Sequence, residues 1–337
     1  MQACMNSFVT ASVTDGTGHL LLDRPAALNA LDLSMVRAIH SALLDWRDDP
    51  AVGAVVVSSS SPKAFCAGGD IRAVREGVLS GDREAVRAFF TEEYRLNRLI
   101  AEYPKPYVAV VDGFAMGGGL GISVHGSARV VTERASFAMP ETRIGFFPDI
   151  GASHFLPRLP GGTGMYLGLT GARISAGAAV ECGLATHFVP SADLPALERD
   201  LFGGGGRDVA GALAAHARPA PSSELTAHRE QIDHCFGAAS LEEVLGRLEA
   251  DGGEWALEVL AELRRASPTA LAVTFELLRR GARSTLAECL ERELRLGEAL
   301  TREPDFAEGV RAVLVDKDHS PAWAPAGPGT AARLLGG

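Results

Sequence analysis

Two acidic residues stand in a part of the sequence that is otherwise apolar. Glu141 lies in the motif MPET at the end of a predicted strand, and Asp149 follows eight residues later in FFPDIG. Their apolar neighbours are Met139, Ile144, Phe146, Phe147 and Ile150. Burial among such side chains raises the pKa of a carboxyl group and suits it to acid-base or nucleophilic chemistry. Either residue alone is equally consistent with a helix cap or an ion pair to Arg143 or Arg158.

Two glycine-rich segments supply a second kind of chemical group. AFCAGGDI (64–71) and AMGGGLG (115–121) each follow a predicted strand and precede a helical pattern. Glycine lets the backbone turn sharply and present N–H groups, and the start of a helix favours negative charge. Two N–H groups that converge on one oxygen form an oxyanion hole, in which each donor contributes about 2.7–4 kcal/mol to transition-state binding. The alternative is that these glycines only permit close packing of helix on strand.

The surrounding sequence alternates short apolar runs with helical patterns. Strands are predicted at residues 19–23, 54–59, 107–113, 128–133 and 136–141. A helix at 34–46 separates the first two strands, which indicates a right-handed βαβ unit with parallel strands. Apolar positions from Val86 to Leu99 predict a second long helix. The fold class is therefore α/β.

The last third of the chain has a different pattern. Residues 203–222 are rich in Gly, Ala and Pro, which is typical of a flexible joint. We therefore expect a core over residues 1–202 that carries the site, the joint at 203–222, and a helical region over 223–337. Helices are predicted at residues 241–248, 255–263, 271–278 and 286–300. Ser267 and Pro268 are expected as the N-cap and first residue of the third helix.

Composition excludes several classes of protein. The 337 residues are 47% hydrophobic and 22% charged, as in a globular protein. The net charge of -10 disfavours non-specific binding of nucleic acid. Lys63, Lys105 and Lys317 are the three lysines, so bound phosphates would meet Arg and backbone N–H groups. The N-terminal residues lack a signal-peptide pattern, and no apolar run is long enough for a membrane span.

The cysteines point away from disulfides and metals. They are Cys4, Cys66, Cys182, Cys235 and Cys289. Their number is odd and none forms a CxxC pair, so we expect no metal site and reduced thiols in a cytoplasmic protein. Cys66 lacks a neighbouring base and is expected to pack beneath its turn rather than to react.

Several motifs resemble one family. RPAALNAL (24–31), KAFCAGGDI (63–71), MGGGLGISVHG (116–126) and FAMPETRIGFFPDIGASHFLPRL (137–159) resemble the enoyl-CoA hydratase/isomerase, or crotonase, superfamily. Together with DFAEGVRAVLVDKDHSPAW (305–323), they are most similar to its 3-hydroxyisobutyryl-CoA hydrolases. The resemblance implies a crotonase-like spiral of ββα units with a C-terminal helical region.

The resemblance also implies a CoA thioester site. The N–H groups of Gly69 and Gly118 would hold the thioester carbonyl oxygen. Ala67 would meet the adenine of CoA through its backbone, and Ala27 and Leu28 would lie in the CoA-binding loop.

The start of the next helix belongs to the same expected CoA-binding set, which includes Asp70, Ile71 and Arg72. Arg72 stands where a lysine is common, which keeps the charge but changes the donor geometry. Ala26 stands where many relatives carry a basic residue, so one phosphate contact is expected to be missing.

One position that differs from the hydratases favours hydrolysis over hydration. Gly121 occupies the position of the first catalytic glutamate of the hydratases, and Glu141 that of the second. Hydrolase relatives also lack the first glutamate and use an aspartate at the position of Asp149. The implied reaction is hydrolysis of 3-hydroxyisobutyryl-CoA, or of a close short 3-hydroxyacyl-CoA, in valine catabolism.

Two routes are open for the chemistry. Glu141 would either attack the carbonyl to form an anhydride or act as general base on a water. Asp149 would orient the substrate's 3-hydroxyl or protonate the leaving thiolate, and the first role explains selectivity better. His154 is a candidate at the border of the pocket. No cofactor is expected besides the CoA of the substrate.

Two other functions remain as alternatives. An enoyl-CoA hydratase or isomerase would remove enoyl absorbance without freeing CoA. A non-catalytic binding protein of the same fold is the other possibility, because a fold does not fix a function. The expected partner is a short acyl-CoA rather than nucleic acid or membrane, and the family favours a homo-oligomer, a trimer or a hexamer.

Overall fold

The computed structural model describes residues 8–327 and 329–336, and the chain forms two compact units whose segments alternate along the sequence. Unit 1 takes the described residues of Met1–Gly69 together with Arg95–Phe137 and Ile174–Glu224. Unit 2 takes Asp70–Tyr94, Ala138–Arg173 and Leu225–Gly337. The division into successive segments at 203–222 stays a prediction, and both units below are described separately.

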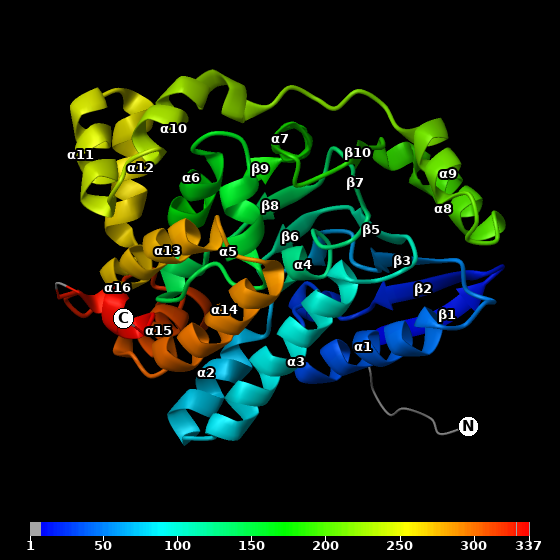
Figure 1. The fold of residues 1–337 in the computed structure, drawn as a ribbon, viewed down its shortest axis with the longest axis horizontal. Helices are drawn as coiled ribbons and strands as arrows, with labels where there is room; N and C mark the ends of the chain where they lie inside the picture. Colours follow the sequence, from blue (N-terminus) through cyan, green and yellow to red (C-terminus); the bar gives the residue numbers. More distant parts are fainter. Residues whose placement is uncertain (1–7, 328, 337) are drawn as a thin grey trace. The chain divides into compact units, whose positions relative to one another are not determined.

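Unit 1 is built on a six-stranded sheet in the order β1-β2-β3-β5-β7-β10. Its strands are β1 (Val9–Thr14), β2 (Thr17–Leu22), β3 (Ala54–Ser59), β5 (Tyr107–Val111), β7 (Ala128–Val131) and β10 (His187–Phe188). β1 and β2 pair antiparallel as a hairpin, and the other neighbours pair parallel. Figure 1 shows β1, β2 and β3 side by side. Four of the five predicted strands lie in this sheet.

Helices cover both faces of this sheet. Val56, Val108 and Val130 pack against α8 (Leu194–Gly203) and α9 (Val209–His216). On the other face, α1 (Leu33–Arg47) places Trp46 directly over Gly18, where a Cβ atom would lie 2.6 Å from the indole ring. The predicted βαβ unit is therefore confirmed, with α1 between the parallel strands β2 and β3.

Part of the predicted joint is helical. Asp208 caps α9 by accepting a hydrogen bond from the N–H of Gly211 at 2.9 Å. Ala212 and Leu213 of this helix are buried in the core of unit 1. The alanines of this segment favour a helix, and two of its apolar side chains reach the core.

A second, four-stranded sheet has the order β4-β6-β8-β9. Its strands are β4 (Ala64–Cys66), β6 (Phe114–Met116), β8 (Ser136–Ala138) and β9 (Ile174–Ser175). β4 and β6 pair parallel, so the two glycine-rich segments leave the sheet at the same edge. The helix predicted after the second segment is only α4 (Gly118–Gly121), and the hydroxyl of Ser123 donates to the carbonyl of Gly119 just beyond its end.

Unit 2 is helical. It contains α2 (Ile71–Ser80), the first residues of α3 (Arg83–Ala101), η2 (Glu141–Ile144), α5 (Ala152–Phe155), η3 (Leu156–Arg158), α6 (Thr163–Thr170), α10 (Arg229–Phe236), α11 (Leu241–Asp251), α12 (Glu254–Arg265), α13 (Pro268–Gly281), α14 (Leu286–Leu300), α15 (Pro304–Val310), the π-helix η6 (Arg311–Val315) and α16 (Thr330–Leu334). The short helices η1 (Pro25–Ala27), α7 (Ala176–Cys182) and η4 (Ser191–Asp193) belong to unit 1, and η5 (Glu224–His228) links the two.

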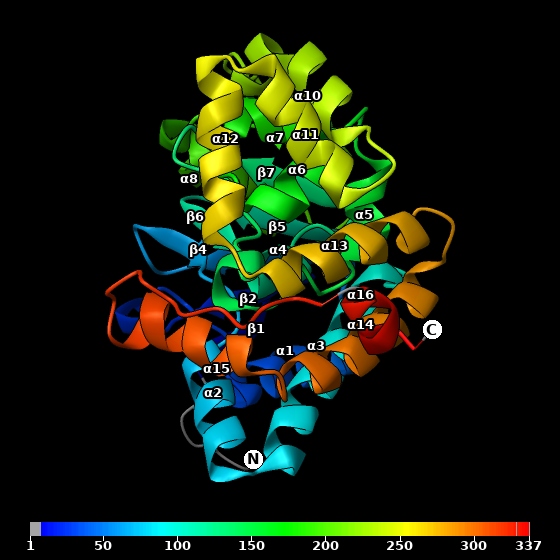
Figure 2. The same cartoon turned by 90° about the vertical axis from the view of Figure 1, so that its left-hand side faces the viewer.

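The four predicted C-terminal helices are confirmed as α11 to α14. Leu248, Leu260 and Phe275 of three of these helices meet in one buried cluster, and Figure 2 shows α10, α11 and α12 packed together. Ser267 caps α13 at the N–H of Ala270, with Pro268 as first residue, as predicted. No helix among the described residues combines the length and apolarity that a membrane span needs.

Candidate active site

The two glycine turns lie against each other in unit 1. Gly68 has a left-handed backbone (φ +104°), and a Cβ atom there would lie 3.7 Å from the amide nitrogen of Gly118. Gly69 follows it and pairs with Leu31 through an isolated parallel bridge. Gly118 is the first residue of α4, where backbone N–H groups have no partner inside the helix. The structure thus brings the predicted oxyanion glycines together on adjacent turns.

Close packing explains why glycine is needed beside Gly118. A Cβ atom on Gly119 would lie 2.4 Å from the carbonyl oxygen of Cys66. Cys66 is fully buried beneath this turn, which confirms its predicted packing role. The packing and oxyanion explanations of the glycines are therefore compatible, because Gly119 permits the approach that brings the amide of Gly118 near the other turn.

The predicted CoA-binding loop also reaches this turn. Ala27 ends η1 and Leu28 has a left-handed backbone with an exposed side chain. The carbonyl of Leu28 accepts a hydrogen bond from the N–H of Ala67 at 3.0 Å. Asn29, which sequence reasoning missed, is buried and donates from Nδ2 to the carbonyl of Phe65 at 3.1 Å. The loop is thus fastened to the strand that leads into the first glycine turn.

In unit 2, the remaining CoA-binding candidates form the start of α2. Asp70 caps the helix by accepting from the N–H of Ala73, Ile71 is its first residue and Arg72 is exposed. Asp70 therefore has a local structural role, while the exposed guanidinium of Arg72 is free to meet solvent or an anion. Their roles in CoA binding stay predictions.

Glu141 begins the 3-10 helix η2 and is buried. Its neighbour Thr142 fixes this segment, donating from Oγ1 to the carbonyl of Leu169 and accepting at its own carbonyl from the N–H of Ser267. Within the described part of the chain, the Oε2 atom of Glu141 has no hydrogen-bond partner. A buried carboxyl oxygen without a partner is uncommon and fits an atom that awaits substrate or water.

Asp149 lies in the same unit and is also buried. Its Oδ2 atom accepts a hydrogen bond of 2.7 Å from the hydroxyl of Tyr94 on α3. The next residue, Ile150, has a left-handed backbone (φ +56°), a conformation that costs a non-glycine residue about 1–3 kcal/mol. Such strain is found where the surrounding structure imposes a side-chain direction, and here it adjoins a candidate catalytic group.

Both candidate carboxyls have perturbed protonation. Burial raises the pKa of Glu141 well above its ordinary value, and the charge of Asp149 raises it further. Burial also raises the pKa of Asp149 to about 7, although the hydrogen bond from Tyr94 acts in the opposite direction. The pKa of Asp149 therefore lies near neutral pH, where a general acid or base is most useful, and burial shifts the pKa of Glu141 in the same direction.

Packed aromatic side chains contribute to the burial of the segment that carries these carboxyls. Phe146 and Phe147 stack with ring centres 4.5 Å apart, and Phe146 also stacks on Phe90 at 5.5 Å. Phe306 packs against the same ring at 5.6 Å. Of the apolar neighbours predicted from the sequence, Met139, Phe146, Phe147 and Ile150 are buried, and Ile144 is partly buried.

Among the described residues, no side chain caps η2 or α5, and both arginines have partners other than Glu141 and Asp149. Arg143 pairs with Glu262 at 3.0 Å, and Arg158 donates to backbone carbonyls that include Ser284 at 2.9 Å.

His154 lies on α5, and burial lowers its pKa, assisted by the charge of Arg158. A lowered pKa keeps this imidazole neutral at physiological pH.

Sequence reasoning missed three polar groups of unit 2. Glu93 is buried, and its Oε1 atom finds no hydrogen-bond partner in residues 8–327 and 329–336. Burial and the charge of Asp149 raise its pKa. Tyr94 lies within the predicted helix from Val86 to Leu99 but was given no role, and Glu293 on α14 went unnoticed. A signal for Glu293 was present, because this residue stands between Leu290 and Leu296 on the buried stripe of its helix.

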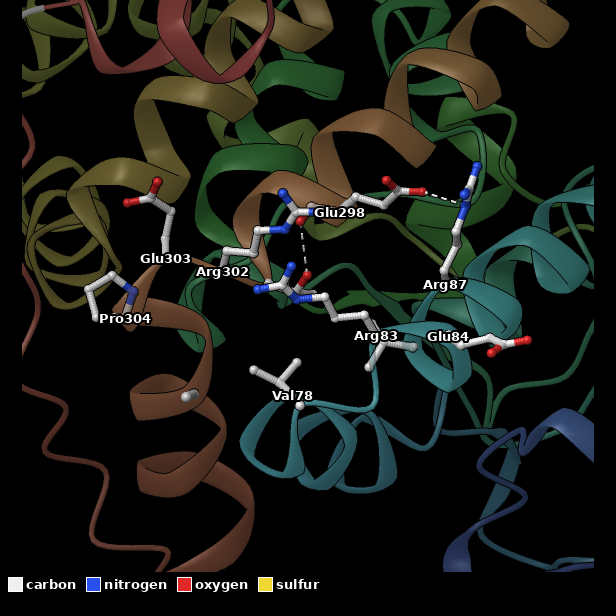
Figure 3. A pocket seen from close by; sticks show the side chains of 12 residues that line it. Val78, Arg83, Glu84, Arg87, Glu298, Arg302, Glu303 and Pro304 are labelled. Atoms are coloured by element: carbon white, nitrogen blue, oxygen red, sulfur yellow. Dashed lines mark hydrogen bonds and ion pairs between the residues drawn. The ribbon is translucent and has the colours of Figure 1, made fainter.

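A cavity of about 590 Å³ in unit 2 lies elsewhere. It opens beside the C-terminal end of α2, and Figure 3 shows the ion pair between Arg87 and Glu298, at 2.9 Å, at its edge. Neither Glu141 nor Asp149 lines it. Among the described residues no group of three or more His, Cys, Asp or Glu is arranged to hold a metal ion.

Comparison with known proteins places this arrangement in a family. The sequence pattern of the enoyl-CoA hydratase/isomerase family matches residues 17–331. The mitochondrial 3-hydroxyisobutyryl-CoA hydrolase of Xenopus tropicalis is 46% identical over 316 residues, which cover 91% of this chain and 82% of the relative. The human mitochondrial 3-hydroxyisobutyryl-CoA hydrolase is 45% identical over 318 residues, which cover 92% and 82%.

Solved structures give the same fold. A crystal structure of an enoyl-CoA hydratase from Rhodobacter sphaeroides has a TM-score of 0.91 and 42% identity, covering 98% of this chain and 97% of that one. A carnitinyl-CoA dehydratase from Mycobacterium thermoresistibile has a TM-score of 0.93 and 37% identity, covering 98% and 96%. The predicted α/β crotonase fold is confirmed. This chain belongs to the enoyl-CoA hydratase/isomerase family.

Proposed function

We propose that this protein hydrolyses the thioester of 3-hydroxyisobutyryl-CoA, or of a close short 3-hydroxyacyl-CoA, to the hydroxy acid and free CoA. The observation that carries the proposal is the pair of buried carboxyls, Glu141 and Asp149, with pKa values raised by burial. Relatives 45–46% identical over most of the chain are named 3-hydroxyisobutyryl-CoA hydrolases. The reaction would belong to valine catabolism.

The proposed mechanism divides the work between amides and carboxyls. The N–H groups of Gly69 and Gly118 would bind the thioester oxygen, which gains negative charge in the tetrahedral intermediate. Glu141 would then act on the carbonyl carbon. It would either attack directly, forming an anhydride that water opens, or take a proton from an attacking water. Both routes require an ionised Glu141 and release CoA as a thiolate.

Asp149 would select the substrate. Tyr94 occupies its Oδ2 atom, so we assign the other oxygen to the substrate's 3-hydroxyl. A site built to bond a hydroxyl rejects an analogue without it by about 10⁴-fold, because the buried polar group is left unpaired. A role in protonating the thiolate would add little, since a thiol with a pKa of about 8.5 is already a good leaving group.

A hydratase reaction is the second candidate, because two similar solved structures carry the titles enoyl-CoA hydratase and carnitinyl-CoA dehydratase. Hydration of an enoyl thioester by the two-carboxylate route needs a glutamate where this chain has Gly121. The side chain of a glycine cannot supply that group. We therefore place hydrolysis first.

Thiol release separates the two functions directly. Purified protein is expected to liberate free thiol from 3-hydroxyisobutyryl-CoA without a lag and without added metal. The same preparation, given a short enoyl-CoA, is expected to leave the enoyl absorbance unchanged. Loss of enoyl absorbance without thiol release would show that the protein is a hydratase rather than a hydrolase. If a panel of short acyl-CoA esters gives neither thiol release nor loss of enoyl absorbance, the protein is a binding protein.

A glycine substitution tests the oxyanion turns. Gly119→Ala would place a Cβ atom against the carbonyl of Cys66 and displace the neighbouring amide of Gly118. We expect kcat for thiol release to fall by about 10²–10³-fold, the cost of one oxyanion donor. Gly246→Ala on α11 is the matched control, because its added methyl group meets open space and is expected to leave kcat unchanged. Equal activity of both variants would argue against this turn as the oxyanion site.

The protein's surroundings complete the proposal. We propose that no cofactor is needed besides the CoA of the substrate, and that the chain assembles as a trimer or hexamer. A cytoplasmic location stays a prediction, and the curated relatives above are named as mitochondrial proteins. Cell fractionation tests the location, and light scattering tests the oligomeric state.

A further inference from the structure

Glu293 is a fully buried carboxylate that the proposed mechanism does not use. From α14 its Oε2 atom accepts a hydrogen bond of 2.7 Å from the N–H of Gly151. Its Oε1 atom accepts from the N–H of Ser153 at 3.0 Å and from the hydroxyl of Ser153 at 2.5 Å. One carboxylate thus receives three hydrogen bonds from a segment 140 or more residues away in sequence, and that segment begins two residues after Asp149.

The segment that Glu293 holds has an unfavourable backbone. Ile150 (φ +56°) and Gly151 (φ +85°) are both left-handed, and a β-branched side chain rarely adopts this conformation. The turn is closed by a hydrogen bond of 2.8 Å from the N–H of Ala152 to the carbonyl of Asp149. An isolated strained turn would relax, so external contacts must impose its shape. The three bonds to Glu293 reach Gly151 and Ser153 directly beyond Ile150, in addition to the hydrogen bonds that His154 and Phe155 donate to the carbonyl of Gly151.

We propose that Glu293 is a positioning residue that holds the Asp149–Ser153 turn and so keeps Asp149 directed at the hydroxyl of the substrate. The inference rests on the proposed function for the role of Asp149. It adds that the C-terminal helical segment contributes to substrate selection through α14, although Glu293 itself does not touch substrate.

The charges around Glu293 agree with a role that depends on hydrogen bonds. Burial raises the pKa of Glu293 to about 8, while the donors on Ser153 and Gly151 lower it and the charge of Asp149 raises it. The groups that face it are Asp149 on the turn, Tyr94 on α3 and Cys289 one turn earlier on α14. Two neighbouring carboxyls repel each other when both are ionised, and the three donors oppose this repulsion only in part, because the pKa of Glu293 stays raised.

Glu293→Gln tests the role with little change in volume. Both carboxylate oxygens act as acceptors, so an amide must turn its NH₂ group toward an N–H or hydroxyl of the turn. The readout is the selectivity ratio, defined as kcat/KM for 3-hydroxyisobutyryl-CoA divided by kcat/KM for isobutyryl-CoA, which lacks the hydroxyl. Since small displacements of a positioned group cost up to about 100-fold, we expect this ratio to fall at least tenfold.

Two further variants complete the test. Glu291 lies on the same helix, is exposed and pairs with Arg295. The control variant Glu291→Gln is therefore expected to leave the selectivity ratio unchanged. Ser153→Ala removes one of the three hydrogen bonds without altering Glu293, and about a threefold fall is expected. This milder variant decides the question if Glu293→Gln does not fold.

The outcomes separate this inference from the proposed function. A folded Glu293→Gln or Ser153→Ala protein with an unchanged selectivity ratio overturns the positioning role, and so does an equal loss of activity on both substrates. If the wild-type protein releases no thiol from any 3-hydroxyacyl-CoA, the proposed function fails instead. A wild-type enzyme that is active and selective, with the ratio lowered in both variants, supports the inference.

Discussion

Replacing Glu141 by Gln is expected to lower kcat for thioester hydrolysis by about 10²–10⁴-fold, the range for loss of a positioned base. Glutamine keeps the shape of the side chain but cannot take a proton or attack a carbonyl. The Oε2 atom of Glu141 is buried and has no hydrogen-bond partner among the residues that the structure describes, so the substitution breaks no hydrogen bond seen there. The fold should therefore survive, and kcat should account for most of the change, with KM nearly constant.

Glu258→Gln on α12 is the matched control for this substitution, because Glu258 is exposed and lies in the same unit. Its rate of thiol release should equal that of the wild type. Thermal unfolding of both variants shows whether structure is preserved. A folded Glu141→Gln enzyme that keeps more than about a tenth of the wild-type kcat would exclude Glu141 as base and as nucleophile.

The pH dependence follows from the same group. Burial and the charge of Asp149 raise the pKa of Glu141, so protonation should remove activity at a pH well above the ordinary range of a glutamate. We expect kcat/KM to fall as the pH is lowered through this raised pKa. Asp149→Asn removes the neighbouring charge and should shift this acid limb to lower pH. A shift to higher pH would show that another group controls the limb.

Local signals account for the parts of the fold that the sequence predicts. The valines of β5 form a continuous apolar run, and Ser267 followed by Pro268 marks the start of α13 within two residues. β9 and β10 have two residues each, and no periodicity can be recognised over such a length. The pairing of these short strands is decided by the rest of their sheets.

The residues of the candidate site also fall into those that the local sequence marks and those that only the folded structure shows. Glu141 and Asp149 are found from the sequence because their apolar neighbours are adjacent in the chain. Tyr94 contacts Asp149 across 55 residues, and Glu293 contacts Ser153 across 140, so only the folded chain shows these partners. In the sequence, such a distant partner can be recognised only as a glutamate at a position that the helical pattern predicts to be buried.

Selectivity for the 3-hydroxyl should depend on Asp149. The wild-type enzyme is expected to prefer 3-hydroxyisobutyryl-CoA over isobutyryl-CoA by about 10⁴-fold in kcat/KM, and Asp149→Asn should reduce this preference by about 10²-fold or more. The loss should fall on the hydroxylated substrate, because the analogue makes no hydrogen bond that Asp149 could lose. Parallel kcat/KM measurements on the two esters check this.

Tyr94→Phe serves as the companion variant, since it removes the hydroxyl that holds Oδ2 of Asp149 but leaves the carboxyl in place. It should raise the pKa of Asp149 further, because that hydrogen bond favours the ionised form, and should lower selectivity less than Asp149→Asn does. If Asp149 instead protonated the leaving thiolate, its replacement would slow both esters equally, because they share the same leaving group. An unchanged ratio in Asp149→Asn, with both esters slowed, would therefore assign Asp149 to the thiolate and leave the hydroxyl to another residue.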